Sequence, residues 1–571
     1  MHFSKLQRQF IALFCLILLL AGFNGGSAAA QQRRGAAKLT AVKPVKLPVK
    51  LVVGIVIDQF RYDYLQRFAD QFGEGGFRRL LNGGAVFTNA NYIHTPTVTA
   101  CGHATFMTGA PPAMTGIIGN EWYDRALGKT ITSVSDDKGQ FKTLGGKEGT
   151  RAAAPHKLLG TTLGDELRLS TQGQAKVIGI SSKDRSAILP AGKRPNAAYW
   201  FDLSSGTYVS STYYFNELPA WVKQFNQEEN CSKYFGAKWD HLLPVAAYQR
   251  SAPDDAVYEQ KARFGYKFPY TLNGGEDKPG ARFYAQFDAS PFANEQLAAL
   301  AKAAIENEAL GADDITDLLT VSFSANDLIG HTYGPYSHEV QDITLRTDRL
   351  LAEFFNYLDK KIGAQNYVIA LTADHGVAPA PEQVKELGYG GRLDNKTAQD
   401  AIQTALSQRF GEEKWVLYFN YGNVYFDEAA IARRKLTVAE VEAVAQAALL
   451  NLPGIAECLT YTQLRQGRVP ANAIGKSVAQ GFHRQRNGNL VIVPEPFFFF
   501  GEASLTTHGT PYSYDTHVPV IFYGAGIAPG QYHNASSPAD IAPTLASLLK
   551  VQPPSNSIGR VLGEALKPVS K

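Results

Sequence analysis

Residues 51–58 read Leu-Val-Val-Gly-Ile-Val-Ile-Asp, a continuous apolar run that ends in a carboxylate. Such a run, without polar alternation, is typical of a strand that is buried on both faces of a parallel sheet. Helical patterns at 297–308 and 343–358 lie between runs of this kind. The alternation predicts an α/β fold around one mostly parallel sheet flanked by helices. The further apolar runs, each followed by a polar cluster, are 177–180, 318–323, 367–371 and 518–522.

Two long segments depart from this alternation. Residues from about 195 to 290 are dense in Tyr, Phe, Asn, Gly and Pro, and residues from about 380 to 500 contain a helical pattern at 438–450 and a Phe run at 497–500. Large α/β enzymes often keep one sheet and lengthen its loops. We therefore expect one catalytic domain at 49–571 with two cap insertions.

The N-terminus has the pattern of a secretory signal. Lys5 and Arg8 precede an apolar run at 10–23, and small residues follow before Gln31. The run is shorter than the ~18 to 20 residues that a spanning helix needs, which argues against a stable membrane anchor. We expect a signal peptide at 1–30, a flexible lead-in at 31–48 and a periplasmic or secreted protein.

Composition excludes several classes of protein. With 571 residues, 45% hydrophobic and 19% charged, the chain can bury a large core and is not disordered as a whole. A net charge of +4, without a dense basic run, argues against a nucleic-acid partner. Cys101, Cys231 and Cys458 show no CxxC spacing, so a thiolate metal site is not expected. Whether Cys231 pairs with Cys458 stays open.

Acidic and histidine residues follow the predicted strands. Asp58 ends the first strand, Asp327 follows the third, and Asp374 and His375 follow the fourth. Ligands bind open α/β sheets at the carboxyl ends of their strands. Each Asp alone is also typical of a helix N-cap. Their agreement at several strand ends favours a common site.

One set of these residues suits a divalent metal. Asp327 and His331 are four residues apart, so on a helix they project from one face and can share an ion. His517, which precedes the last apolar run, is the candidate third ligand. An Asp, His, His set without sulfur suits zinc, although other divalent ions fit the same ligands. The other histidines of interest are expected to be core or loop residues: His94, His338 and His508.

Asp58, Asp374 and His375 remain as ligands for a second ion. Two ions a few ångströms apart can clamp the attacking and the leaving oxygen of a phosphoryl group. Thr99 is the candidate nucleophile, because it precedes a predicted helix whose N-terminal amides favour an anionic phosphate. A threonine hydroxyl becomes reactive once a metal or a base removes its proton. The alternative role for Thr99 is a plain helix N-cap.

Six motifs, in order along most of the chain, resemble the alkaline phosphatase superfamily. More narrowly, they look like the threonine-nucleophile bacterial alkaline phosphatases, which are related to the nucleotide pyrophosphatase/phosphodiesterases. One departure is Thr115, where relatives commonly carry a histidine that is not a metal ligand. The motifs are PTVTACGHATFMTG (96–109), GNEWYD (119–124), SSKDRSAILPAG (181–192), ANDLIGHTYGP (325–335), TADHG (372–376) and YDTHVPV (514–520).

The resemblance implies an alkaline-phosphatase-like sheet and two Zn²⁺ per chain, with Thr99 as a metal contact between them. It leaves room for an additional structural divalent ion. Asp515 is expected to orient a metal ligand. The implied ligands are Asp327, His331 and His517 for one zinc, and Asp58, Asp374 and His375 for the other.

The substrate class depends on Lys183 and Arg185. A monoester transition state carries more charge on its nonbridging oxygens than a diester, so it gains more from cationic donors. The resemblance implies that this Lys-x-Arg pair, together with Asn120, contacts the phosphoryl oxygens, whereas diesterases generally lack the pair. We therefore predict hydrolysis of small phosphate monoesters through a phosphothreonine, with activity that rises toward alkaline pH, by a monomer or weak homo-oligomer.

A phosphodiesterase or nucleotide pyrophosphatase of the same superfamily is the alternative function. A sulfatase is disfavoured, because the C/S-x-P/A-x-R motif of those enzymes is missing around Cys101. A binding protein that keeps the fold without turnover is also disfavoured, since the nucleophile and every expected ligand are present.

Overall fold

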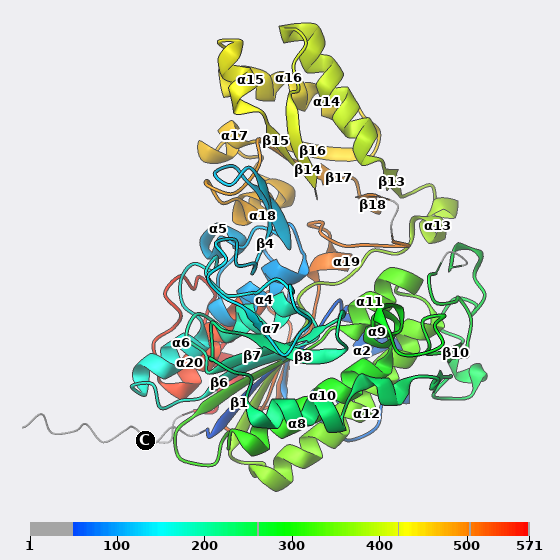
Figure 1. Ribbon diagram of the computed structural model, residues 1–571, viewed down its shortest axis with the longest axis vertical. Helices are drawn as coiled ribbons and strands as arrows, with labels where there is room; N and C mark the ends of the chain where they lie inside the picture. Colours follow the sequence, from blue (N-terminus) through cyan, green and yellow to red (C-terminus); the bar gives the residue numbers. More distant parts are fainter. Residues whose placement is uncertain (1–48, 260–261, 421, 502–503, 569–571) are drawn as a thin grey trace, which may run out of the picture. The chain divides into compact units, whose positions relative to one another are not determined.

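The computed structural model describes residues 49–259, 262–420, 422–501 and 504–568 (Figure 1). The described residues all belong to one compact unit. The predicted signal peptide and lead-in lie outside the described residues. Among the described residues, no helix has the length and apolar character needed to cross a membrane.

A ten-stranded sheet forms the centre of this unit, in the order β20-β2-β19-β12-β1-β11-β6-β7-β8-β5. Its five inner strands, from β12 to β7, are all parallel, which confirms the predicted sheet. The strands are β1 (Leu51–Ile57), β2 (Ala85–Phe87), β5 (Thr143–Leu144), β6 (Val177–Ser181), β7 (Ala197–Asp202), β8 (Thr207–Ser211), β11 (Asp317–Phe323), β12 (Tyr367–Thr372), β19 (Val520–Gly524) and β20 (Gly530–Tyr532).

One of the predicted parallel strands has the opposite direction. β19 runs antiparallel to both β12 and β2. A buried apolar run has the same composition in either direction, so the sequence pattern alone does not distinguish the two.

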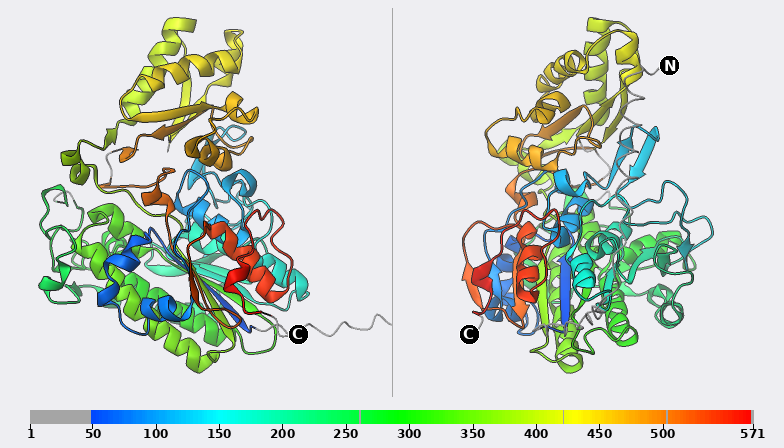
Figure 2. Two further views of the ribbon diagram at one scale, coloured as in Figure 1. Left: turned by 180° about the vertical axis from the view of Figure 1, so that it is seen from behind. Right: turned by 90° about the vertical axis from the view of Figure 1, so that its left-hand side faces the viewer.

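Helices cover both faces of the sheet, because the side chains of β1 alternate between two buried clusters. Leu51 and Val53 pack in one cluster with α10 and α12, whereas Val52 packs in the other with α4 and α20. Figure 2 shows the sheet between the green α10 and α12 and the red α20. The first face carries α2 (Asp63–Arg67), α3 (Phe77–Gly83), α8 (Ala220–Glu228), α9 (Ala281–Asp288), α10 (Pro291–Asn307), α11 (Ala325–Tyr333) and α12 (His338–Lys361). The second face carries α4 (Thr99–Thr108), α6 (Leu163–Ser170) and α20 (Ile541–Leu549).

Smaller elements connect these layers. α7 packs on β6 and against α4. β7 and β8, at the start of the first predicted insertion, extend the central sheet, so only the segment after them departs from it. The remaining elements are α5 (Pro112–Thr115), α7 (Asp184–Ala191), α19 (Ser513–Thr516), the hairpin of β3 (Glu121–Asp124) and β4 (Lys129–Thr132), and the pair β9 (Lys238–Trp239) and β10 (Tyr270–Thr271).

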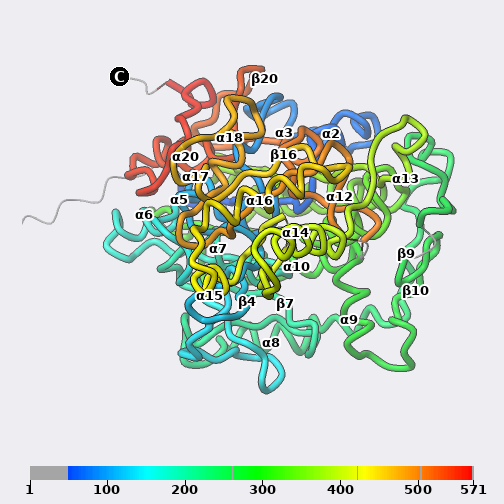
Figure 3. Tube along the Cα trace, turned by 90° about the horizontal axis from the view of Figure 1, so that it is seen from above, coloured from blue at the N-terminus to red at the C-terminus, as the bar shows by residue number. Residues whose placement is uncertain are grey.

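Residues 391–494, here called the cap, have a sheet and a core of their own. The antiparallel sheet has the order β14-β15-β17-β16, and α14 and α16 lie side by side over it (Figure 3). That this region is an insertion relative to other proteins stays a prediction. Its elements and their neighbours are α13 (Pro381–Val384), β13 (Gly391–Leu393), α14 (Asn395–Phe410), β14 (Val416–Asn420), β15 (Asn423–Phe426), α15 (Glu428–Arg433), α16 (Val438–Leu450), β16 (Ile455–Thr460), α17 (Tyr461–Arg465), α18 (Ala473–Gly481), β17 (Leu490–Pro494) and β18 (Phe498–Phe500).

Cys101, Cys231 and Cys458 are all buried and free. The pairing of Cys231 with Cys458, left open by the sequence, is therefore absent from this structure.

Candidate active site

The predicted acidic and histidine residues meet at the carboxyl edge of the three central strands. Asp58 follows β1, Asp327 lies in the first turn of α11 after β11, and Asp374 and His375 follow β12. All four side chains are buried. Nε2 of His375 lies 3.5 Å from Oδ1 of Asp58 and 3.3 Å from Oδ2 of Asp374. The three side chains predicted as ligands of the second ion, Asp58, Asp374 and His375, thus lie together.

A second ligand cluster consists of Asp327, His331 and His508, whose ligand atoms lie within 4.8 Å of one another. Nε2 of His331 is 3.2 Å and Nε2 of His508 is 3.6 Å from Oδ1 of Asp327. The ring of His508 also stacks on His375, with 3.5 Å between centroids. The two clusters are therefore in direct contact.

His517 is not part of this cluster, which corrects the sequence prediction. Its Nε2 lies 2.9 Å from the carbonyl oxygen of Thr88, and its ring stacks on Tyr62 with centroids 4.7 Å apart. Its backbone forms a bridge with Asn91 ahead of β19. His508, expected to be a core or loop residue, takes the place predicted for His517.

The three clustered histidines share one orientation. In each, Nδ1 lies next to a backbone carbonyl, which can only accept a hydrogen bond. Nδ1 therefore carries the proton, and Nε2 presents a lone pair to the cluster, as in metal-ligating histidines. The opposite holds for His517, whose Nε2 faces a carbonyl. The carbonyl partners of His331, His375 and His508 are Thr506, Gly376 and Thr97, at 2.8, 2.9 and 2.8 Å.

Two buried carboxylate oxygens at the site lack a partner. Oδ1 of Asp58 and Oδ2 of Asp374 form no hydrogen bond within the described part of the chain. Burial, together with the Asp374 carboxylate, raises the pKa of Asp58 well above its usual range. Buried charges of this kind are costly unless they are paired or coordinate a metal. The unpartnered oxygens and the oriented histidines fit a divalent cation.

Lys183 lies against the carboxylates of the two clusters. Its Nζ lies 2.7 Å from Oδ2 of Asp58 and 2.5 Å from Oδ2 of Asp327. Although burial raises the pKa of Asp327, Lys183 and His331 outweigh it and hold that pKa well below its usual range. Arg185 lies in α7, 3.9 Å from Asp184, and its Nε has no hydrogen-bond partner among the described residues.

Thr99 is the first residue of α4, and its Oγ1 lies 3.4 Å from Nε2 of His375. The N-cap position belongs to Val98, so Thr99 does not act as the N-cap. The backbone N–H of Ala100 donates to Oδ1 of Asn120 at 2.8 Å. This bond fixes the Asn120 amide beside the candidate nucleophile.

Two buried side chains that the sequence did not single out connect these parts. Nδ1 of His103 lies 2.9 Å from the Thr99 carbonyl and 3.2 Å from Oδ2 of Asp374. Gln59 donates its backbone N–H to Asp374 at 3.1 Å and its side-chain amide to Asp327 at 2.7 Å. The backbone of Gln59 has a φ angle of 62°, a conformation that is uncommon for residues other than glycine. His103 could have been predicted to lie near the site, because it follows Thr99 by four residues on a predicted helix. For Gln59, the only indication in the sequence is its position directly after Asp58.

Asp515 holds the turn that follows His508. Its Oδ2 accepts hydrogen bonds from the N–H groups of Gly509 and Thr510, at 3.0 and 2.8 Å, and from Oγ1 of Thr510 at 2.7 Å. Asp515 thus acts on the position of His508 through the backbone.

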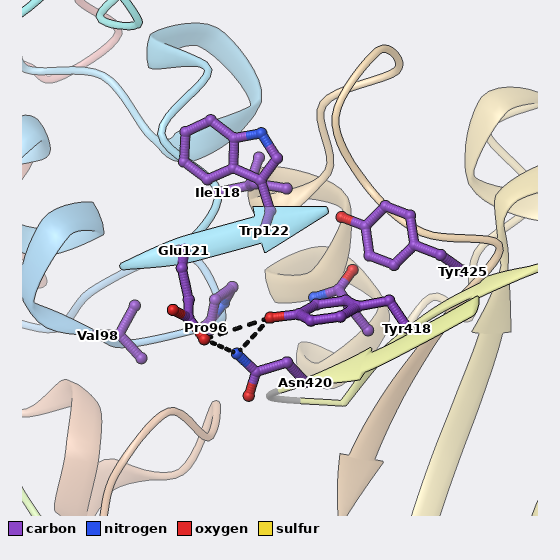
Figure 4. A pocket seen from close by; sticks show the side chains of 10 residues that line it. Pro96, Val98, Ile118, Glu121, Trp122, Tyr418, Asn420 and Tyr425 are labelled. Carbon is purple, nitrogen blue, oxygen red and sulfur yellow. Dashed lines mark hydrogen bonds between the residues drawn. The ribbon is translucent and has the colours of Figure 1, made fainter. Parts of the chain in front are cut away.

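The cap contacts the loop that carries Asn120. Figure 4 shows Tyr418 and Asn420 of β14 beside Glu121, which follows Asn120, and beside Pro96 in the turn before Thr99. Nδ2 of Asn420 donates to Oε1 of Glu121 at 2.6 Å. The cap therefore reaches the surroundings of the candidate nucleophile, Thr99.

Comparison with known proteins assigns the chain to a family. A model of the family described as type I phosphodiesterase / nucleotide pyrophosphatase matches residues 52–517. Alkaline phosphatase PhoV of Synechococcus elongatus is 38% identical over 562 residues, covering 98% of this chain and 100% of PhoV. Alkaline phosphatase PafA of Elizabethkingia meningoseptica is 38% identical over 527 residues, covering 90% and 94%. A Myroides odoratus protein named calcium-transporting ATPase is 38% identical over 525 residues, covering 91% and 95%.

The fold agrees with these relatives. The crystal structure of wild-type PafA superposes with a TM-score of 0.85 at 37% identity, covering 91% of this chain and 99% of PafA. The chain belongs to the type I phosphodiesterase / nucleotide pyrophosphatase family, in the group that contains the alkaline phosphatases PhoV and PafA.

Proposed function

We propose that this protein is an alkaline phosphatase that hydrolyses phosphate monoesters through a covalent phosphothreonine at Thr99. The observation that carries the proposal is the position of Lys183, whose ammonium group lies on Asp58 and Asp327 at the ligand cluster next to Thr99. The names of PhoV and PafA support the same activity.

The ligand chemistry supports two zinc ions. One would be held by Asp58, Asp374 and His375, with Thr99 as a further contact. The other would be held by Asp327, His331 and His508 rather than His517. All donors are nitrogen or oxygen, which suits zinc. When bound, such ions activate a hydroxyl nucleophile and stabilise the leaving oxygen of a phosphoryl transfer.

The residues of the chain have separate roles in this reaction. Oγ1 of Thr99 attacks phosphorus, so that an Oγ1–P bond forms and the bond from phosphorus to the leaving oxygen breaks. Water then cleaves the phosphothreonine and releases phosphate. The amide of Asn120, fixed by Ala100, and the ammonium of Lys183 hold the nonbridging oxygens. Arg185 is the candidate third donor, because its buried Nε is unpartnered among the described residues. Activity is expected to rise toward alkaline pH.

A phosphodiesterase is the second candidate, because the family model carries that description. The test is the ratio of turnover on p-nitrophenyl phosphate to turnover on bis-p-nitrophenyl phosphate, with zinc supplied. We expect a ratio far above one, which falls by about 10²-fold or more in the Lys183→Ala/Arg185→Ala variant. Lys193→Ala/Arg194→Ala, in the segment that follows the same helix, is the matched control. A ratio near one, or no change in the variant, would assign the protein to the phosphodiesterases.

We also propose that the enzyme acts in the periplasm or outside the cell on small-molecule substrates. The support is the signal-like pattern of residues 1–30. N-terminal sequencing of the protein from its native host tests it: cleavage near Ala30 is expected, and a retained N-terminus would contradict export through this segment.

A further inference from the structure

A separate cluster of ligand-type side chains lies at the start of α12. His241, Asp254 and His338 each offer one ligand atom, and these atoms lie within 4.8 Å of one another. Their side chains are only 10%, 16% and 8% exposed. None of the three belongs to the two clusters of the candidate active site. From the sequence, His338 was expected to be a core or loop residue.

The three ligand atoms lie close enough together to share an ion, and the two histidines are also at hydrogen-bond distance from each other. Nε2 of His241 lies 3.0 Å from Nδ1 of His338, and Oδ1 of Asp254 lies 3.8 Å from the same Nδ1. The second distance is too long for a hydrogen bond. Tetrahedral zinc with bonds of about 2.0–2.1 Å keeps its ligand atoms about 3.3–3.4 Å apart, which lies between the two values.

Aromatic rings enclose the two histidines. The ring of His241 packs on Phe268 and Tyr248, with centroids 4.0 and 4.7 Å apart. Tyr248 also packs on His338, at 5.0 Å. This packing restricts the orientation of both imidazole rings, as metal ligation requires.

Two buried glutamates near the cluster have carboxyl oxygens without hydrogen-bond partners. Glu259 is 1% exposed, and neither of its carboxylate oxygens has a hydrogen-bond partner among the described residues. Glu339, the neighbour of His338, is fully buried and has one unpartnered oxygen. No Lys or Arg in the described part of the chain forms an ion pair with either glutamate.

We propose that His241, Asp254 and His338 bind a divalent cation of the zinc type, independently of the catalytic ions. The ion would connect Asp254 to the first turn of α12. The loop after Asp254 contributes Tyr258 and Phe264 to a cavity of about 760 Å³ that is also lined by His331. This ion would therefore fix one wall of the cavity on the leaving-group side of the catalytic cluster.

The test is the zinc content per chain, measured by mass spectrometry on purified wild-type protein and on His241→Ala and Asp254→Asn. We expect each variant to hold one zinc fewer than wild type. His156→Ala is the matched control, since His156 lies 3.9 Å from Asp136 without a second histidine. It should keep the wild-type content. Added zinc should raise the melting temperature of wild type more than that of the variants.

Asp254→Asn preserves shape, so it decides the question if His241→Ala does not fold. Equal zinc content in wild type and in folded Asp254→Asn would overturn the proposal. The difference of one ion does not depend on turnover. Failure of the phosphatase proposal would instead appear as an inactive wild-type enzyme with the expected zinc content.

Discussion

Gly102, three residues after Thr99, lies directly against the backbone of Asp374. A methyl group on its Cα would stand 2.1 Å from the Asp374 carbonyl oxygen and 2.7 Å from its Cα. The helix that begins at the proposed nucleophile thus packs at backbone distance on the strand end that carries two of the proposed metal ligands. Only glycine permits this approach.

Gly102→Ala should separate Thr99 from the ligand cluster, because the neighbouring atoms are backbone and cannot rotate away. A displacement of about 1 Å can cost about 10²-fold in rate, so we expect a loss of that order in kcat/KM. Gly73→Ala is the control, since its new methyl group would meet Asp348 at 3.6 Å, an ordinary contact. Steady-state kinetics on p-nitrophenyl phosphate measure both variants. Full activity in Gly102→Ala would show that the packing is not required.

Thr99→Ala should reduce turnover by about 10³-fold or more, because the covalent step loses its nucleophile. Thr99→Ser should keep measurable turnover, since it retains a hydroxyl. Acid quenching of each enzyme with labelled phosphate monoester should give labelled protein for wild type and none for Thr99→Ala. Labelled Thr99→Ala would place the covalent bond on another residue.

His508→Ala and His517→Ala distinguish the two candidate ligands. We expect His508→Ala to lose one catalytic ion and about 10²-fold or more of the activity, because its Nε2 faces the cluster. His517→Ala should keep both, with a modest loss of stability from the bond to Thr88 and the stacking on Tyr62. Metal analysis and kinetics on the two proteins decide; the reverse pattern would restore His517 as the ligand.

Asp515→Asn should change how stability depends on pH. Burial raises the pKa of Asp515 from 3.8 to about 7, so the folded protein keeps a proton that the unfolded chain has lost between these values. The free energy of unfolding of wild type should therefore fall as pH rises from about 4 to about 7, by up to about 4 kcal/mol. In Asp515→Asn, the free energy of unfolding should lack the pH-dependent decrease that Asp515 causes in wild type.

The substitution itself is mild, because Oδ2 accepts the three hydrogen bonds and Oδ1 has no partner in the described residues. An amide can put its oxygen at the first position and its NH₂ at the second. Urea unfolding of both proteins from pH 4 to pH 8, with a chelator present, measures the effect. Parallel curves would contradict the raised pKa.

The sequence predicted the parts of the fold that depend on local composition. Buried parallel strands are continuous apolar runs, so β1, β6, β11 and β12 could be located, and their carboxyl ends placed Asp58, Asp327, Asp374 and His375 together. The direction of β19 depends on the path of the chain between strands. The periodicity of apolar residues in the sequence contains no information about that path.

The sequence pointed to His517 instead of His508 as the third member of the Asp327 cluster for a similar reason. His508 belongs to a polar loop, and its place depends on the Thr97 carbonyl and on the turn held by Asp515, both remote or irregular in sequence. His517 stood in a recognisable position before an apolar run, but its ring turns to Thr88. Side-chain direction in a loop is set by tertiary contacts, which a pattern of residues does not contain.

The three cysteines of the described residues bear on how the protein responds to oxidising and thiol-modifying conditions. Cys101, Cys231 and Cys458 are each 0% exposed. Burial raises the pKa of each thiol, which suppresses the reactive thiolate. The described part of the chain therefore needs no oxidant or disulfide isomerase to fold. We expect alkylating reagents to leave these three thiols unmodified as long as the protein is folded.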